Sequence, residues 1–168
     1  MSSSRELLKP VSLGYILFTT LLALLFALIP WNPVIRSVLP DCVLWILLYW
    51  GLHQPRHVGL GFAFFLGIVL DIGDANIFGQ HALAYCTALF LCLERRRQIL
   101  VFPSWQQSVY IAPLMLLSQA VMWAIRMATG SPNPGGAYFI GPIFAAGLWP
   151  FLCHFVRWPQ RKEKPAEL

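Results

Sequence analysis

Six runs of apolar residues follow one another along the 168-residue chain, separated by short segments that hold most of its charged side chains. The runs cover about residues 11–29, 37–52, 58–73, 78–93, 105–127 and 137–157. A helix of about 20 apolar residues crosses a bilayer. The pattern therefore predicts an all-α integral membrane protein, in which about six transmembrane helices with short loops form a single domain over residues 1–168.

Two parts of this pattern leave an alternative open. The runs at 37–52 and 58–73 are short for perpendicular spans, so together they could form one broken hairpin that re-enters from the same side. The first run follows Arg5 and Lys9, as the apolar part of a signal peptide would. It is long for that role and no small-residue cleavage site follows it, so we expect an uncleaved first span.

The composition agrees with a membrane location. Hydrophobic residues make up 58% of the chain and charged residues only 11%, whereas soluble domains carry roughly 25% charged residues. The chain therefore lacks the polar surface that a water-soluble protein needs, and we expect membrane lipid and no nucleic acid among its partners.

The basic residues predict the orientation. If both termini are cytoplasmic, the cytoplasmic segments hold ten basic residues and the other side only Arg36 and Arg126. The ten are Arg5, Lys9, Arg56, Arg95, Arg96, Arg97, Arg157, Arg161, Lys162 and Lys164. Because cytoplasmic loops are enriched in Lys and Arg, we expect six spans with both ends inside. The triplet at 95–97 is interpreted as an orientation signal, with binding of anionic lipid or a cytoplasmic partner as the alternative.

The cysteines give no sign of a metal or cofactor site. All four lie inside apolar runs and none forms a CxxC pair. Free cysteine behaves as a small hydrophobe, so we predict no disulfide, no zinc site and no cofactor. The four are Cys42, Cys86, Cys92 and Cys153.

Small residues recur every four positions in the third run. Gly59, Ala63, Gly67 and Asp71 share one helix face at this spacing, and small residues allow another helix to approach closely. We therefore predict a helix-packing stripe, with Asp71 facing protein instead of lipid. At the end of this stripe Asp71 serves either as a helix cap or in a functional role.

Asp71, Asp74 and His81 flank the short connection between the third and fourth runs. Charged groups inside a bilayer are costly unless they pair or lie at its boundary. A hairpin here would bring Asp71 and His81 within reach of one another. A metal site is chemically plausible, but no further His or Cys cluster supports it. No activated nucleophile is evident either, so we expect a polar hairpin that holds the bundle or a partner helix.

Three further polar or helix-breaking residues lie in the last two runs. Gln119 is in the middle of the fifth run and needs a partner there. Arg126 either extends to the outer surface or pairs with an aspartate, Asp41 or Asp71, of which we favour Asp71. Pro150 predicts a bend of the last span after Gly147.

Three stretches together resemble one family, the rod shape-determining protein MreD. They are PDCVLWILLYWGL (40–52), GLGFAFFLGIVLDIGDANIFGQHALAY (59–85) and GPIFAAGLWPFLCHFVRWPQ (141–160). The resemblance extends from Val11 to Gln160. It places the family's third-span aspartate on Asp71, the turn glycine on Gly79, the opening of span two on Pro40 and Asp41, and the late proline on Pro150. His81 falls on a less constrained position.

The resemblance implies a non-catalytic component of the cell-elongation machinery in the bacterial inner membrane. Such proteins associate with the bitopic protein MreC and, through it, with MreB, RodA and a class B penicillin-binding protein. Another protein's helix would then dock on the small-residue faces. Assembly of the chain into a homo-oligomer is left as an alternative. The family's helices resemble those of substrate-binding subunits of energy-coupling-factor transporters. This likeness supplies the rival hypothesis, a small-molecule binder whose pocket uses Asp71, Gln119 and Arg126; a membrane enzyme is the third.

Overall fold

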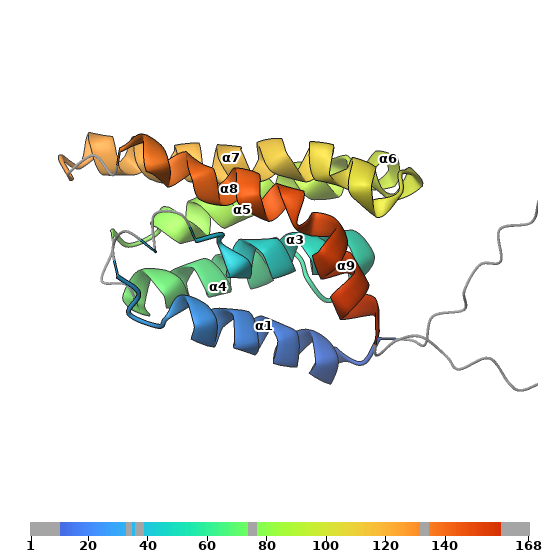
Figure 1. Cartoon of the computed structure of the whole chain (residues 1–168). Helices are drawn as coiled ribbons and strands as arrows, with labels where there is room; N and C mark the ends of the chain where they lie inside the picture. Colours follow the sequence, from blue (N-terminus) through green and yellow to red (C-terminus); the bar gives the residue numbers. More distant parts are fainter. Residues whose placement is uncertain (1–10, 33–34, 36–38, 74–76, 132–134, 159–168) are drawn as a thin grey trace, which may run out of the picture.

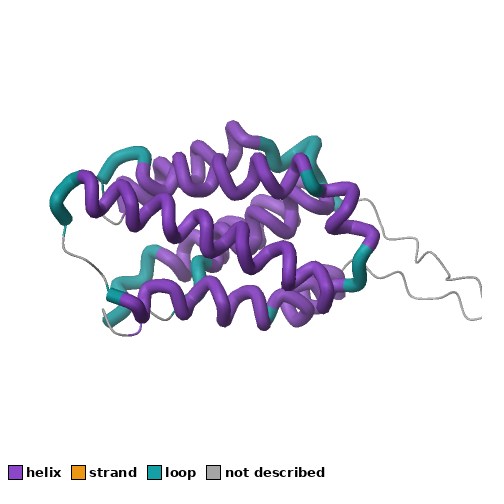
Figure 2. Tube along the Cα trace, turned by 90° about the horizontal axis from the view of Figure 1, so that it is seen from above, coloured by secondary structure: helices purple, strands orange, loops and turns teal. Residues whose placement is uncertain are grey.

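The computed structural model of the protein describes residues 11–32, 35, 39–73, 77–131 and 135–158. All regular elements in these ranges are helices, which confirms the all-α prediction (Figure 2). In chain order they are α1 (Leu13–Ala27), α3 (Cys42–His53), α4 (Leu60–Gly73), α5 (Gln80–Glu94), α6 (Arg96–Val101), α7 (Ser104–Ala128), the 3-10 helix η1 (Gly136–Phe139), α8 (Ile140–Gly147) and α9 (Trp149–Arg157).

Five of the six apolar runs contain one main helix each, and the sixth is divided among η1, α8 and α9. Among the described residues, only α7 is by itself long and apolar enough to cross a membrane. The bent pair formed by η1–α8 and α9 makes a second candidate if it counts as one span. Helices α1, α3 and α4 are apolar but shorter. The short helix α6 lies between the fourth and fifth apolar runs, where the pattern predicts only a connection.

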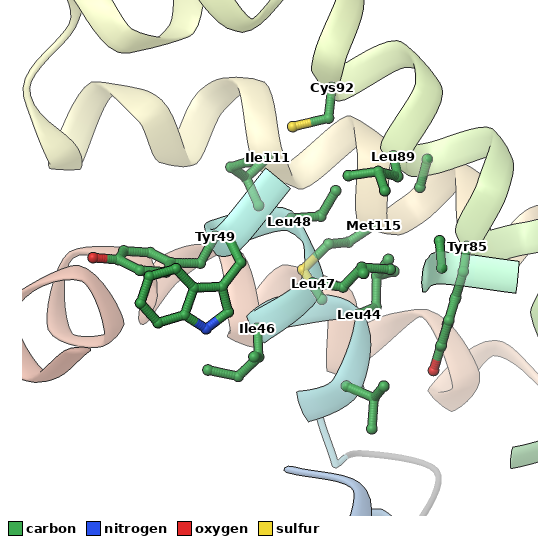
Figure 3. Close-up of a cluster of buried hydrophobic side chains, with 14 of the residues drawn as sticks. Leu44, Ile46, Leu47, Leu48, Tyr49, Tyr85, Leu89, Cys92, Ile111 and Met115 are labelled. Atoms are coloured by element: carbon green, nitrogen blue, oxygen red, sulfur yellow. The ribbon is translucent and has the colours of Figure 1, made fainter. Parts of the chain in front are cut away.

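Helix α3 lies at the centre of the bundle. Its residues from Val43 to Leu52 are buried, with Trp45 alone half-buried, as expected for a helix that is hydrophobic on every side. Figure 3 shows Leu47 and Leu48 of this helix among Leu89 of α5 and Met115 of α7. Inside a bilayer such contacts stabilise through close packing and dispersion, because lipid is as apolar as the side chains.

Two buried indole groups connect outer helices to their neighbours. The Trp50 Nε1–H donates to Thr19 Oγ1 at 2.9 Å, which joins α3 to α1. The Trp149 Nε1–H donates to Gln107 Oε1 at 3.1 Å, which joins α9 to α7. A tryptophan N–H normally has a partner when it is buried, and these bonds fix how each helix pair is rotated.

The first and last described helices meet at one end of the bundle. Figure 1 shows α1 beginning where α9 ends, and the Tyr15 hydroxyl donates to the Val156 carbonyl at 3.2 Å. The α3–α4 turn and α6 lie at this same end, whereas α3 begins and α4 ends at the opposite one. The arginines at 56 and 95–97 are therefore gathered at one end, as the orientation prediction requires.

The last apolar run is bent where Pro150 predicted a bend. The segments Gly136–Gly147 and Trp149–Arg157 meet at 48°, and Pro150 lies in the first turn of α9. Proline has no N–H to continue the hydrogen-bond ladder of α8, but it is well tolerated at the first positions of a new helix. The chain therefore ends one helix and starts another here.

Candidate functional site

The contact between α4 and α5 depends on the small-residue stripe. Ala63 and Gly67 are buried, and a Cβ on Gly67 would overlap the Cα and N of Ala82 in α5. Gly59 has open space around its Cβ position. The stripe thus packs against α5 of the same chain. The hypothesis that it receives another protein's helix is wrong at Ala63 and Gly67, because both residues are buried within this chain and α5 lies against Gly67.

Asp71, in the last turn of α4, caps the helix that follows it. Its carboxylate accepts hydrogen bonds from the Gly79 N–H at 2.9 Å and the His81 N–H at 3.0 Å. Gly79 precedes α5 with φ +88°, a conformation suited to glycine, and has no side chain to cap the helix. The first N–H groups of a helix need acceptors, and a negative charge there is favourable. Asp71 provides both.

The same carboxylate binds the imidazole of His81. Nδ1 of His81 lies 2.7 Å from Oδ1 of Asp71, and the Asp71 side chain is fully buried while that of His81 is 12% exposed. The hairpin therefore brings the two residues into contact, which the short turn between them made plausible.

A second aspartate performs a matching role for α3. Asp41 is the N-cap of this helix and accepts from the Leu44 N–H at 2.9 Å; Pro40 directly precedes it. The Tyr85 hydroxyl lies 2.8 and 2.7 Å from the two carboxylate oxygens and donates to this carboxylate. The ring of Tyr85 also packs edge-on against His81, with centroids 5.8 Å apart.

These four side chains, Asp41, Asp71, His81 and Tyr85, form what we call the polar cluster. The cluster joins α3 and α4 to α5, because each aspartate caps one helix and is held by a side chain of α5. Carboxylates in apolar surroundings require partners of this kind. The hydrogen bonds of the cluster therefore hold three helices in register.

The described residues contain no group of three or more His, Cys, Asp or Glu side chains that could hold a metal ion. Asp74, the third candidate ligand from the sequence, lies outside the described residues. The geometry of the polar cluster is that of helix caps with their hydrogen-bond partners.

Gln119 and Arg126 of α7 both contact η1. The Gln119 Nε2 donates to the Tyr138 carbonyl at 3.1 Å, and the Arg126 guanidinium lies over the Tyr138 ring, 5.7 Å from its centroid, as in a cation–π contact. The predicted pair of Arg126 with Asp71 is wrong. Asp71 bonds to residues eight and ten positions later in its own hairpin, and Arg126 packs on the segment after its own helix.

Tyr85 is the member of the polar cluster that sequence reasoning missed. Its hydroxyl bonds to a residue 44 positions earlier in the chain. The sequence does show a tyrosine in an apolar helix, four residues after His81. This spacing places it on the same helix face as His81. That spacing identifies the face of α5 but gives no indication that Asp41 would lie opposite.

We expect Tyr85→Phe to lower the free energy of unfolding by about 1–3 kcal/mol, because it removes a part-buried hydrogen bond to a charged group and keeps the ring. Tyr110→Phe is the matched control, since Tyr110 stacks on Phe102 through its ring. Both variants can be compared by chemical unfolding of the purified protein in detergent. Equal stabilities would show that the Asp41–Tyr85 bond does not hold α3 to α5.

The sequence profile of the family described as rod shape-determining protein MreD matches residues 9–158. The chain belongs to the MreD family. It is also 24% identical over 143 residues to the rod shape-determining protein MreD of Haemophilus influenzae, an alignment that covers 85% of this chain and 88% of the relative. No solved structure matches the chain.

Membership of the MreD family supports a role in shape determination and identifies the chain as a membrane protein. MreD is a family of shape-determining structural proteins and is not known as a family of enzymes. The matched region runs from before α1 to the end of α9. It therefore includes the whole described bundle and every residue of the polar cluster.

Proposed function

We propose that this MreD-family chain is a non-catalytic scaffold of the bacterial cell-elongation machinery in the inner membrane. In this role it binds the bitopic protein MreC and connects it to MreB, RodA and a class B penicillin-binding protein. The observation that carries the proposal is the family match over residues 9–158. The polar cluster supports it, because its hydrogen bonds join helices.

A partner helix would dock on the outside of this bundle. The inner face of α4 is occupied by α5, whereas large apolar side chains are exposed on several outer faces: Phe18 of α1, Phe65 of α4 and Phe155 of α9. In a bilayer these side chains contact lipid or another transmembrane helix. The polar cluster would keep α3, α4 and α5 in fixed positions behind such a contact.

Photo-crosslinking in cells tests this proposal. A photoreactive residue is placed singly at Phe18, Phe65 or Phe155, and at buried Leu48 as the control. We expect one outer face to crosslink to tagged MreC and Leu48 to give no product. If none of the three outer positions forms a crosslink to MreC, the proposal that MreC docks on the outer helix faces of this chain is contradicted.

We also propose that the chain crosses the membrane six times with both termini in the cytoplasm. The observation behind this topology is that basic residues gather at one end of the bundle. In a background without native cysteines, a cysteine at exposed Thr129 should react with an impermeant thiol reagent outside spheroplasts, and one at exposed Gln98 should not. Labelling of Gln98→Cys from outside would contradict the orientation.

The rival function, a vitamin-type small-molecule binder, has less support. Its pocket needs free polar groups from Asp71, Gln119 and Arg126. The Asp71 carboxylate is bonded to α5, the Gln119 amide donates to the Tyr138 carbonyl, and Arg126 packs on the Tyr138 ring. The likeness of the helix arrangement to energy-coupling-factor subunits stays a prediction.

A further inference from the structure

The short helix α6 is held against the end of α3 by one of its faces. The Arg96 Nε–H donates to the Leu52 carbonyl at 2.6 Å, and Ile99, three residues later on the same face, is 1% exposed. A cation at the last carbonyls of a helix is favourable. The Arg96 side chain is therefore bound to the end of α3, whereas its neighbours Arg95 and Arg97 are exposed.

The opposite face of α6 is both basic and apolar. Arg97 and Val101 are four residues apart and share this face; both are exposed, and Val101 is 80% exposed. Arg95, just before the helix, is also exposed, as is Arg56 in the turn that follows α3. Because Arg96 ties α6 to the end of α3, the exposed arginines of both segments lie at the same end of the bundle.

The charge at this end is strongly positive. Its described residues include five arginines and one acid, Glu94, so the balance is 5 − 1 = +4 with the histidines neutral. The arginines are Arg56, Arg95, Arg96, Arg97 and Arg157. Arg157 is turned toward α3, with Nη2 2.8 Å from Nε2 of His53. The three exposed arginines thus leave a positive surface that no described acid other than Glu94 offsets.

Exposed apolar side chains follow these charges along the chain, at the start of α7. Trp105 and Val109, in the first turns of α7, are 65% and 71% exposed and share one face of the helix. Tryptophan is enriched where membrane hydrocarbon meets water. The exposed arginines are therefore located where phospholipid headgroups lie, next to side chains that would contact the acyl chains.

We propose that the exposed arginines Arg56, Arg95 and Arg97 bind the phosphate headgroups of anionic phospholipid, whose acyl chains lie along Val101, Trp105 and Val109. The guanidinium group matches phosphate through paired hydrogen bonds. An acidic protein segment would bind the arginines but would not need the exposed apolar side chains nearby. These apolar side chains therefore favour a lipid over an acidic protein as the ligand. The site is independent of the proposed scaffold role.

Lipid exchange on the purified full-length protein tests the site. The protein is equilibrated with dioleoyl phosphatidylglycerol and dioleoyl phosphatidylethanolamine in mixed micelles, and the lipids retained through gel filtration are counted by mass spectrometry. We expect phosphatidylglycerol to be enriched. The Arg95→Gln, Arg97→Gln double variant should bind it about 25-fold more weakly, at about fivefold per arginine, with phosphatidylethanolamine retention unchanged.

Two further arms separate the explanations. The Arg95→Lys, Arg97→Lys variant keeps the charge but cannot form the paired hydrogen bonds of a guanidinium group, so it should retain more phosphatidylglycerol than the glutamine variant and less than the parent. An excess of inorganic phosphate should leave the retained lipid in place, because phosphate cannot replace the acyl-chain contacts. Unchanged phosphatidylglycerol binding in the glutamine variant would overturn the proposal. So would displacement of the lipid by inorganic phosphate, which would indicate a site for the free anion.

Discussion

Gly67→Ala should destabilise the protein by about 3 kcal/mol, the upper part of the usual range for overpacking. The new Cβ would overlap backbone atoms of Ala82, so no side-chain rotation can relieve the contact and α4 must move away from α5. That movement would also lengthen the hydrogen bonds that the Asp71 carboxylate accepts from Gly79 and His81. The loss should therefore exceed the gain of up to about 1 kcal/mol that alanine brings to a helix.

Gly61→Ala is the matched control for this substitution. Gly61 lies in the same helix, and its Cβ position has open space. The control should be as stable as the parent or slightly more stable. Chemical unfolding in detergent, together with the yield of monodisperse protein, measures both variants. If Gly67→Ala is as stable as Gly61→Ala, the close approach of α4 and α5 is not present in the protein.

Asp71→Asn should lower the free energy of unfolding by about 3 kcal/mol. The amide cannot accept at both positions, so an N–H at the start of α5 or the imidazole of His81 loses its acceptor, and the charge-assisted bonds are lost. The helix cap contributes a further share of this loss. Unfolding measurements on Asp71→Asn should show the change with no alteration in helix content of the native state.

A double-mutant cycle identifies the partner of Asp71. Asp71→Asn should cost at least about 1 kcal/mol less when His81→Gln is already present, because residues in contact are coupled. In an Arg126→Gln background, Asp71→Asn should lower the free energy of unfolding by as much as it does in the parent, since Arg126 packs on Tyr138. Coupling to Arg126 without coupling to His81 would contradict the hydrogen bonds described for the polar cluster.

The sequence predicted the parts of the fold that depend on neighbouring positions. Apolar runs located the five main helices, and the four-residue spacing of Ala63 and Gly67 identified the face on which α4 packs. The short turn before His81 made its contact with Asp71 plausible. These predictions succeed because the periodicity of a helix and the length of a turn are set by local chain geometry.

The rest depends on how distant segments meet, which periodicity does not encode. The hydrogen bond from Tyr85 to Asp41 joins positions 44 residues apart. Arg126 packs on Tyr138 instead of pairing with Asp71 because of the path that the chain takes after α7. The small-residue stripe could have served this chain or a partner equally well. Only the position of α5 decided between them.

Native mass spectrometry of the full-length chain, purified from cells that also express MreC, tests the scaffold proposal most directly. We expect a complex that contains both proteins, and no stoichiometric small molecule other than phospholipid on this chain. The opposite result, a stoichiometric vitamin-sized ligand with no MreC bound, would contradict the scaffold and favour a small-molecule carrier.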